Sequence, residues 1–347
     1  MVDFAGWSMP VQYSSIVAEH QATRTAAALF DVSHMGRVFF SGPDAAKFLD
    51  RLVTRRITDL QPGKIRYGLV TNPEGGILDD VLVYQLPTPG EYQMVVNASN
   101  REKIVRWCEQ QQAGDDVQME DRTRQTAMIA VQGPKTLEIL APLAETDLAA
   151  MRYYTCREAT VAGVTALVSR TGYTGEDGFE VVVPAEQAVA VWEKILQAGA
   201  DQGAIPAGLA SRDTLRLEAG MPLYGHELSE EINPVQAGLA FAVNTEGRDF
   251  IGREAIARFM QDVQQLKRVG LQLSGRRVPR EGYAIVAGPA EVGHVTSGTF
   301  SPTLNHPIAM GYVKPEHAVV GVVLGIDIRG HHEPATVVPL PFYKRQS

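Results

Sequence analysis

Three carboxylates that interrupt apolar, strand-like runs are the first candidates for chemistry in this chain. Asp79 and Asp80 are adjacent in GGILDDVLVY, and Glu180 lies in GFEVVV just after a glycine-rich turn. Neighbouring side chains of a strand point to opposite faces, so one acid of the pair should face inward. A buried carboxylate is costly unless a protein group or a ligand hydrogen-bonds it. Taken alone, each acid is also consistent with a strand-end residue that caps a turn.

A second polar cluster lies on a predicted short helix, SRDTLRLEAG, over residues 211–220. Arg212 and Arg216 are four residues apart and Asp213 and Arg216 are three apart, so these side chains are neighbours on the helix surface. Exposed ion pairs of this kind contribute little stability. The flanking segments GLA and AGMPLYG are apolar, however, and this predicts a half-buried helix.

A bound ligand would explain the two groups together. A carboxylate suits an N–H/NH2 edge that donates two parallel hydrogen bonds, and an arginine suits a ring carbonyl or a carboxylate. Tyr67, Tyr173 and the thioether of Met35 could line an apolar slot around a planar ring. A 2-amino-4-oxo heterocycle such as a pterin has this edge, but the residue types alone do not select a pterin over a purine.

Standard catalytic motifs are missing from the sequence. There is no GxxxxGK[ST], no strand-anchored GxGxxG, no GxSxG and no HExxH, which argues against P-loop NTPases, Rossmann dehydrogenases, serine hydrolases and zinc enzymes. His331 and His332 have no spaced partners, so no metal is expected. Cys108 and Cys156 are too few for a disulfide framework, and we expect both to be reduced structural thiols.

The elements that must position these residues show a weak internal duplication. The first half has RVFF followed by SGPDAAKFLDRLV, and the second has AMIAV followed by QGPKTLEILAPLA. Each is a β-like run, a Gly-Pro step and an amphipathic helix, with Pro43 and Pro134 predicted in the first helical turn. Downstream, each half has paired strands that lead into a helix. The pattern predicts α+β layers with mostly antiparallel sheets.

The residue pattern changes near Lys267, after which short β-like segments alternate with turns rich in Gly, Pro and charged residues. This is typical of a small all-β sandwich or barrel. With 347 residues the chain is too long for one ordinary domain. We therefore predict one module of two interleaved α+β lobes over residues 1–265 and a β-barrel domain over 266–347.

Composition narrows the class of protein. The chain is 45% hydrophobic and 21% charged, which is ordinary for a globular protein, and its formal charge is −8. Without a basic excess, no nucleic-acid partner is expected. No stretch is apolar enough to span a membrane, and the N-terminus does not read as a signal peptide, so a cytoplasmic protein without a membrane partner is expected.

Ordered motifs along the whole chain also carry a family resemblance. They are MVDFAGWSMPVQY, LFDVSHMG, TNPEGGILDDVLVY, VVNAS, AVQGP, TGYTGEDGFE, LASRDTLRLEAGMPLYGHEL, FIGREA and TSGTFSPTL. Together they resemble the aminomethyltransferases, or T-proteins, of the glycine cleavage system. The resemblance implies a three-lobed clover-leaf fold, in which two duplicated α+β lobes form a folate-binding module and a β-barrel ends the chain.

The resemblance also implies roles for individual residues. Asp80 matches the family's catalytic carboxylate beside the reacting folate nitrogens, and Glu180 and Arg212 match the residues that hold the pterin ring. Four others match further pocket positions: Met35, Tyr67, Asn97 and Tyr173.

The implied reaction is an aminomethyl transfer. A lipoylated H-protein presents the aminomethyl group on a sulfur of its lipoyl arm, and the co-substrate tetrahydrofolate takes the carbon as 5,10-methylenetetrahydrofolate. Ammonia and the dihydrolipoyl H-protein are released, and no metal is involved. We expect Asp80 to accept a proton and to stabilise developing cationic charge.

Two surface features are weaker candidates. Tyr343 is a candidate contact for the folate tail. Basic residues near the start of the last domain could steer an acidic partner protein, although scattered residues of a solvated loop would look the same in sequence; they are Lys267, Arg268, Arg276, Arg277 and Arg280.

Two alternative functions share parts of this pattern. The folate-binding half of dimethylglycine and sarcosine oxidases has similar motifs, but those enzymes carry an appended flavin domain and this chain has no dinucleotide fingerprint. Non-catalytic folate-binding assembly factors typically show a KGC-type motif where this chain has TGYTGEDG. Both alternatives are therefore disfavoured.

Overall fold

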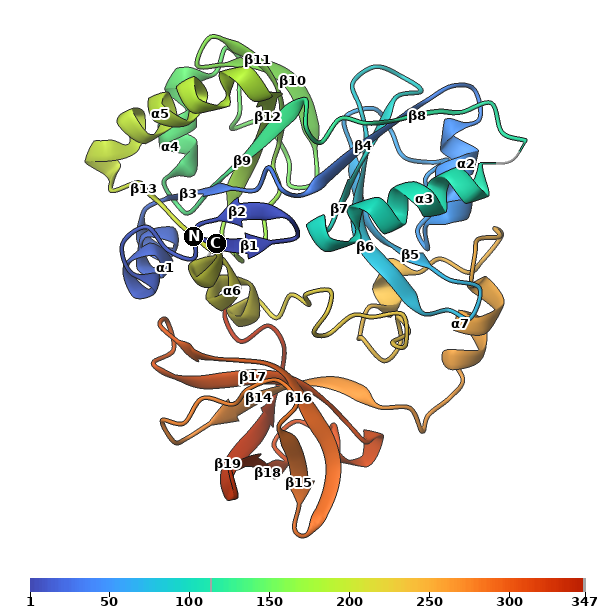
Figure 1. Ribbon diagram of the computed structural model, residues 1–347, viewed down its shortest axis with the longest axis vertical. Helices are drawn as coiled ribbons and strands as arrows, with labels where there is room; N and C mark the ends of the chain where they lie inside the picture. The colour runs from blue at the N-terminus through green and yellow to red at the C-terminus, as the bar shows by residue number, and fades with distance from the viewer. Residues whose placement is uncertain (113, 346–347) are drawn as a thin grey trace.

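Two large β-sheets with covering helices, a separate two-stranded hairpin and one closed β-barrel make up the chain, as the computed structural model shows (Figure 1). The structure describes residues 1–112 and 114–345. The two α+β lobes lie side by side, and the barrel lies below them in the view of Figure 1. The predicted α+β architecture with a C-terminal barrel is confirmed.

The first lobe has a five-stranded antiparallel sheet of order β5-β6-β7-β4-β8. Its helices bury Phe48, Leu49, Ile104 and Cys108 against the sheet. The elements are β4 (Gly36–Ser41), α2 (Ala45–Leu52), β5 (Ile65–Thr71), β6 (Ile77–Gln85), β7 (Tyr92–Val96), α3 (Arg101–Gln111) and β8 (Gln118–Asp121).

The second lobe has a six-stranded sheet of order β10-β11-β12-β9-β3-β13, in which only the β3–β13 pair is parallel. Its helices contribute Ile139, Val191 and Ile195 to the core. The elements are β3 (Ala28–Asp31), β9 (Thr126–Gln132), α4 (Thr136–Leu140), β10 (Cys156–Val161), β11 (Val164–Ser169), β12 (Gly178–Pro184), α5 (Ala188–Gly199) and β13 (Ile205–Pro206).

The duplication is visible in how β4 and β9 end. Each strand is followed by a glycine with positive φ, Gly42 at 114° and Gly133 at 134°. A Cβ on either glycine would lie within 2.6 Å of a backbone oxygen, so no other residue fits there. Pro43 and Pro134 follow these glycines and lie in the turn before each helix. The prediction that they lie in the first helical turn is therefore wrong.

The two sheets exchange strands at two crossovers. β3 lies in the second sheet, but the chain then crosses through residues 32–35 into β4 of the first (Figure 1). β8 lies in the first sheet, but the chain crosses back through residues 122–125 into β9 of the second. Each sheet therefore contains one strand from the opposite half of the duplication.

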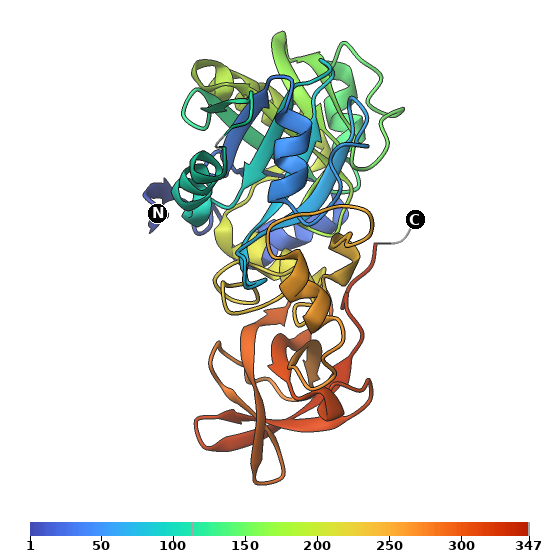
Figure 2. The ribbon, with the colours of Figure 1, turned by 90° about the vertical axis from the view of Figure 1, so that its right-hand side faces the viewer.

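The barrel closes because β14 pairs with both β17 and β19. Apolar side chains such as Leu271, Val295 and Ile326 fill its interior. Figure 2 shows the barrel at one end of the molecule, with the last residues running back towards the lobes. The strands are β14 (Lys267–Leu273), β15 (Ala284–Ala287), β16 (Ala290–Ser301), β17 (His306–Val313), β18 (Val323–Ile328) and β19 (His331–Val338).

The remaining elements connect the two lobes and the barrel or extend their helices and loops. They are the hairpin of β1 (Val2–Phe4) and β2 (Trp7–Met9), with α1 (Ile16–Thr25), α6 (Leu209–Glu218), α7 (Arg253–Phe259) and the short 3₁₀ helices η1 (Ala98–Asn100), η2 (Ala141–Leu143), η3 (Ala185–Gln187), η4 (Ala200–Gln202), η5 (Ala240–Ala242) and η6 (Pro315–His317). Both cysteines are free and buried. Within the described ranges, none of the helices could cross a membrane.

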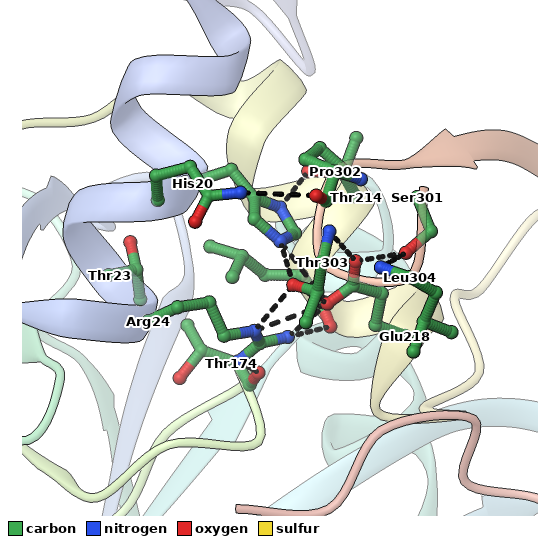
Figure 3. A network of polar contacts seen from close by, with 12 residues as sticks. His20, Thr23, Arg24, Thr174, Thr214, Glu218, Ser301, Pro302, Thr303 and Leu304 are labelled. Atoms are coloured by element: carbon green, nitrogen blue, oxygen red, sulfur yellow. Dashed lines mark hydrogen bonds and ion pairs between the residues drawn. The ribbon is translucent and has the colours of Figure 1, made fainter. Parts of the chain in front are cut away.

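Helix α6 is held in place by a buried polar network centred on Glu218 (Figure 3). One carboxylate oxygen accepts hydrogen bonds from Ser301 Oγ at 2.5 Å and Thr303 N at 3.1 Å, both from the barrel. The other lies 2.8 Å from Arg24 Nη2 and 3.2 Å from His20 Nε2, both on α1. The barrel and α1 thereby fix the helix that carries Arg212.

Candidate active site

A cavity of about 1340 Å³ lies where the two lobes, α6 and β16 meet. Its wall includes Asp80 of β6, Glu180 of β12 and Arg212 of α6, together with Thr296 and Ser297 of the barrel. The structure brings together all the site residues predicted from the sequence, since each lines this cavity: Met35, Tyr67, Asp80, Asn97, Tyr173, Glu180 and Arg212.

The two adjacent aspartates have different surroundings, as their positions in a strand predict. Asp79 is fully buried and accepts hydrogen bonds from Asn97 N at 3.0 Å, Asn97 Nδ2 at 2.8 Å and Asn100 Nδ2 at 2.6 Å. Asp80 lines the cavity and accepts from Asn97 Nδ2 at 2.8 Å and Tyr67 Oη at 3.2 Å. Asn97 therefore ties the buried acid to the cavity-facing one.

Burial makes this pair more basic than ordinary carboxylates. Burial and the neighbouring Asp80 raise the pKa of Asp79 to about 8. Burial also raises the pKa of Asp80, although hydrogen bonds from Asn97 and Tyr67 oppose the rise. Burial and Asp80 raise the pKa of Tyr67 well above 10, so its hydroxyl stays protonated and donates. Asp80 is thus equipped to accept a proton from a group inside the cavity.

Glu180 and Arg212 face the cavity from the second lobe and α6. Thr171 Oγ1 donates to Glu180 Oε2 at 2.5 Å, and within the described ranges no protein donor reaches Oε1. Burial raises the pKa of Glu180. Arg212 Nη1 is buried without a hydrogen-bond partner, and Cζ lies 4.8 Å from the centre of the Tyr173 ring. Glu180 therefore offers a free acceptor and Arg212 a free donor, as recognition of a polar ring edge requires.

Two cavity residues were missed by the sequence reasoning. His34 is 3% exposed, and its Nδ1 has no hydrogen-bond partner among the described residues. Burial, with the nearby charges of Arg212 and Arg37, lowers the pKa of His34 to about 3, so the ring is neutral. Phe241 of η5 stacks on Tyr67 with 6.2 Å between ring centroids. His34 lies in the motif LFDVSHMG, which could have pointed to it, whereas Phe241 has no such signal in the sequence.

Tyr343 is not among the cavity-lining residues. Its ring stacks 4.0 Å from Arg24 Cζ, and its N–H donates to Glu218 O at 2.8 Å. The C-terminal tail therefore uses Tyr343 for packing, and a contact with the folate tail is not supported.

The basic residues near the start of the barrel have different surroundings. Arg268 turns inward and donates to the carbonyls of Ala237 at 2.8 Å and Gly220 at 3.0 Å. Arg277 pairs with Glu333 at 2.6 Å, and Arg280 lines the cavity. Strand β14 separates Lys267 from Arg276, Arg277 and Arg280, which follow its far end, and the steering of an acidic partner by these residues stays a prediction.

Metal-binding chemistry has no obvious ligand set in the described part of the chain. Across residues 1–112 and 114–345, no three His, Cys, Asp or Glu side chains gather as a metal ion would require. The cavity instead combines carboxylates with raised pKa values, the guanidinium of Arg212, neutral donors and aromatic walls. Such a set can bind a polar ring and move a proton.

Comparisons with known proteins agree with this geometry. Residues 1–247 match the family model described as the GCVT N-terminal domain, and residues 267–344 match the glycine cleavage T-protein C-terminal barrel domain. The chain is 50% identical to an aminomethyltransferase of Streptomyces coelicolor and 47% identical to one of Geobacillus kaustophilus, covering 94% of each. These alignments span 100% and 99% of this chain.

A solved structure extends the similarity to three dimensions. The chain resembles the glycine cleavage system aminomethyltransferase T from Bartonella henselae with a TM-score of 0.92 and 33% sequence identity. The match covers 99% of this chain and 94% of that protein. The shared fold therefore includes both lobes and the barrel.

Proposed function

The chain belongs to the glycine cleavage T-protein family, and we propose that its central cavity binds tetrahydrofolate and receives the aminomethyl-lipoyl arm of an H-protein. Like its relatives, the protein is an aminomethyltransferase. The observation that carries the proposal is the convergence of Asp80, Glu180 and Arg212 on one cavity from two lobes and α6.

The free polar atoms of the cavity fit a reduced pterin. Glu180 Oε1 can accept an N–H of the 2-amino-4-oxo edge, and the unpartnered Nη1 of Arg212 can donate to an acceptor on the same molecule. Tyr173 and Met35 supply apolar surface for the ring faces. These are the residue types that the recognition of a flat, polar heterocycle requires.

The size of the cavity supports two simultaneous ligands. Small-molecule pockets measure roughly 300–1,000 Å³, and this cavity measures about 1340 Å³. Phe241 and Tyr67 stack beside Asp80, and the exposed ring of Phe241 offers an apolar surface for an aliphatic arm. We propose that the folate and the lipoyl arm meet at Asp80.

The reaction needs proton transfer as well as carbon transfer. The aminomethyl carbon loses its bonds to the lipoyl sulfur and to the amine, and it gains bonds to two folate nitrogens. The two protons that leave those nitrogens end on the thiol and on ammonia. Asp80, with its raised pKa, is placed to accept a proton from a folate nitrogen and to stabilise the cationic carbon unit. Tyr67 and Asn97 orient the carboxylate by donating to it.

The parts of the chain then have distinct tasks. We propose that residues 1–265 act as one folate-binding module and that 266–347 form a barrel domain whose contacts with Glu218 align α6. Positioning of this kind can supply much of the rate enhancement of a transfer between two bound groups.

A reconstituted assay tests the proposal. Purified protein is mixed with aminomethyl-loaded H-protein and tetrahydrofolate, and ammonia and 5,10-methylenetetrahydrofolate are followed. We expect equal amounts of the two products and none when either substrate is omitted. Ammonia release that does not depend on tetrahydrofolate would contradict the proposed co-substrate.

A further inference from the structure

A fully buried arginine without a carboxylate partner lies where the two lobes exchange strands. Arg37, at the start of β4, is 0% exposed. In the described ranges, no acidic side chain lies within ion-pair distance of its guanidinium. A buried charge is normally paired with an opposite charge. The burial of the Arg37 guanidinium must therefore be compensated by other contacts.

All the hydrogen bonds of this guanidinium go to the two crossovers and the strand that follows the second. From the first crossover it binds the carbonyl oxygens of Met35 at 2.5 Å and Ser33 at 3.1 Å. From the second crossover it binds the carbonyl oxygen of Thr123 at 2.6 Å. Thr126, the first residue of β9, supplies its carbonyl oxygen at 2.9 Å and its hydroxyl at 2.8 Å. One side chain therefore clamps both crossing segments together.

The first crossover presents two residues to the cavity. Met35 and His34 both line it, and the carbonyls that Arg37 holds flank His34 on either side. The Nδ1 atom of His34 is buried without a protein partner, and its ring packs edge-on against Phe4. Burial, together with the neighbouring charges of Arg212 and Arg37, lowers the pKa of His34 and keeps the ring neutral. The imidazole is thus a neutral polar group in the cavity wall, and Arg37 binds the carbonyl oxygens of the residues on either side of it.

We propose that Arg37 is a positioning residue that fixes the crossover at residues 32–35 and so presents His34 and Met35 to tetrahydrofolate. The inference rests on the proposed function, because the ligand it concerns is the folate. Arginine suits this task since its planar fork carries five N–H donors, whereas a lysine ammonium carries three.

The chain offers a matched control for a merely structural arginine. Arg248 is also a buried arginine that binds backbone carbonyls, those of Val53 and Thr54 at 2.8 and 2.7 Å. It also pairs with Asp50 at 3.1 Å. None of these three partners lines the cavity. Loss of Arg248 should therefore lower stability without a direct effect on the pocket.

The experiment compares tetrahydrofolate affinity and thermal stability in Arg37→Met, Arg37→Lys and Arg248→Met. Calorimetry under anaerobic conditions gives the Kd for tetrahydrofolate, and calorimetric unfolding gives the Tm. We expect Arg37→Met to weaken affinity about tenfold, as for the loss of one ligand contact. Arg37→Lys should recover part of that loss, and Arg248→Met should bind as the unaltered protein does. In turnover, the KM for tetrahydrofolate should change more than kcat, because Asp80 is untouched.

A double-variant cycle separates positioning from general damage. If Arg37 acts through His34, the affinity loss in Arg37→Met/His34→Ala should be smaller than the product of the two single losses. Arg37→Lys replaces Arg37→Met in the cycle if the latter does not fold. Unchanged affinity in both Arg37 variants, or an equal loss in Arg248→Met, would overturn the inference. Absence of folate binding by the unaltered protein would instead contradict the proposed function.

Discussion

At the scale of single residues, the cavity divides its work between one acid that moves a proton and one that holds the ring. Asp80 lies among donors that orient it, and burial raises its pKa. Glu180 has one oxygen satisfied by Thr171 and the other free for a ligand. Substitutions at the two acids should therefore affect different steps.

For Glu180→Gln we expect weaker tetrahydrofolate binding with little change in folding. A hydrogen bond to a charged group contributes about 1.5–3 kcal/mol, which corresponds to a loss of affinity of about 10- to 100-fold. Equilibrium titration with tetrahydrofolate measures the affinity of Glu180→Gln. The control is Asp80→Asn, which we expect to keep its affinity for tetrahydrofolate. A Glu180→Gln variant that binds tetrahydrofolate as tightly as the unaltered protein would remove Glu180 from the pterin site.

For Tyr67→Phe we expect the acid limb of the kcat/KM profile to move to higher pH. Asp80 must be ionised to accept a proton, and the Tyr67 hydroxyl stabilises that ionised form, which lowers the pKa of Asp80. Without the hydroxyl the pKa of Asp80 rises, so Asp80 becomes protonated, and the enzyme loses activity, at a higher pH. A pH series on both proteins measures the shift, and a move to lower pH would contradict this assignment.

At the scale of elements, the sequence predicts what depends on local pattern and misses what depends on distant partners. The duplicated strand–helix units and the barrel follow from periodicity and turn residues, and Asp79, Asp80 and Glu180 were found because acids in apolar strands need partners. Which sheet β3 and β8 join is decided by contacts across the molecule, so local pattern does not predict the crossovers, and the motif LFDVSHMG alone does not show that His34 lines the cavity. The inward direction of Arg268 could not be predicted for the same reason, since spacing along the chain does not determine where a side chain points.

Glu218 tests the link between α6, α1 and the barrel. Burial alone would raise the pKa of Glu218, but His20, Ser301 and Arg24 outweigh it and lower the pKa to about 2. A folded-state pKa below the ordinary 4.5 stabilises the fold above that pH by about 3 kcal/mol, and the gain is lost as the pH falls towards 2. At neutral pH the Glu218→Gln variant should unfold at a lower urea concentration than the unaltered protein. The difference between the two urea midpoints should become smaller as the pH falls. A difference between the midpoints that does not change with pH would contradict a stabilising role for the ionised Glu218 carboxylate.

At the scale of the whole molecule, the cavity joins parts of the chain that are far apart in sequence. Its wall combines β6, β12, α6 and β16, so ligand binding should order all four elements together. A ligand at about 100 times its Kd stabilises the folded state by about 2.7 kcal/mol.

Hydrogen exchange should reveal that coupling in the barrel. Thr296 and Ser297 of β16 line the cavity, so amide protection along Ala290–Ser301 should rise when tetrahydrofolate binds. Strand β18, which lies elsewhere in the barrel and does not line the cavity, serves as the internal control. Protection gained only in the lobes would mean that the barrel takes no part in the site.

The most direct measurement is a single turnover of aminomethyl-loaded H-protein with tetrahydrofolate, comparing the unaltered protein with Asp80→Asn. General acid–base groups contribute about 10²- to 10⁴-fold to rate. We expect the variant to bind tetrahydrofolate normally, to keep its fold, and to form 5,10-methylenetetrahydrofolate at least about 100-fold more slowly. A variant that transfers the carbon at the unaltered rate, with normal folate affinity, would contradict the assignment of Asp80 as the catalytic acid–base residue of this cavity.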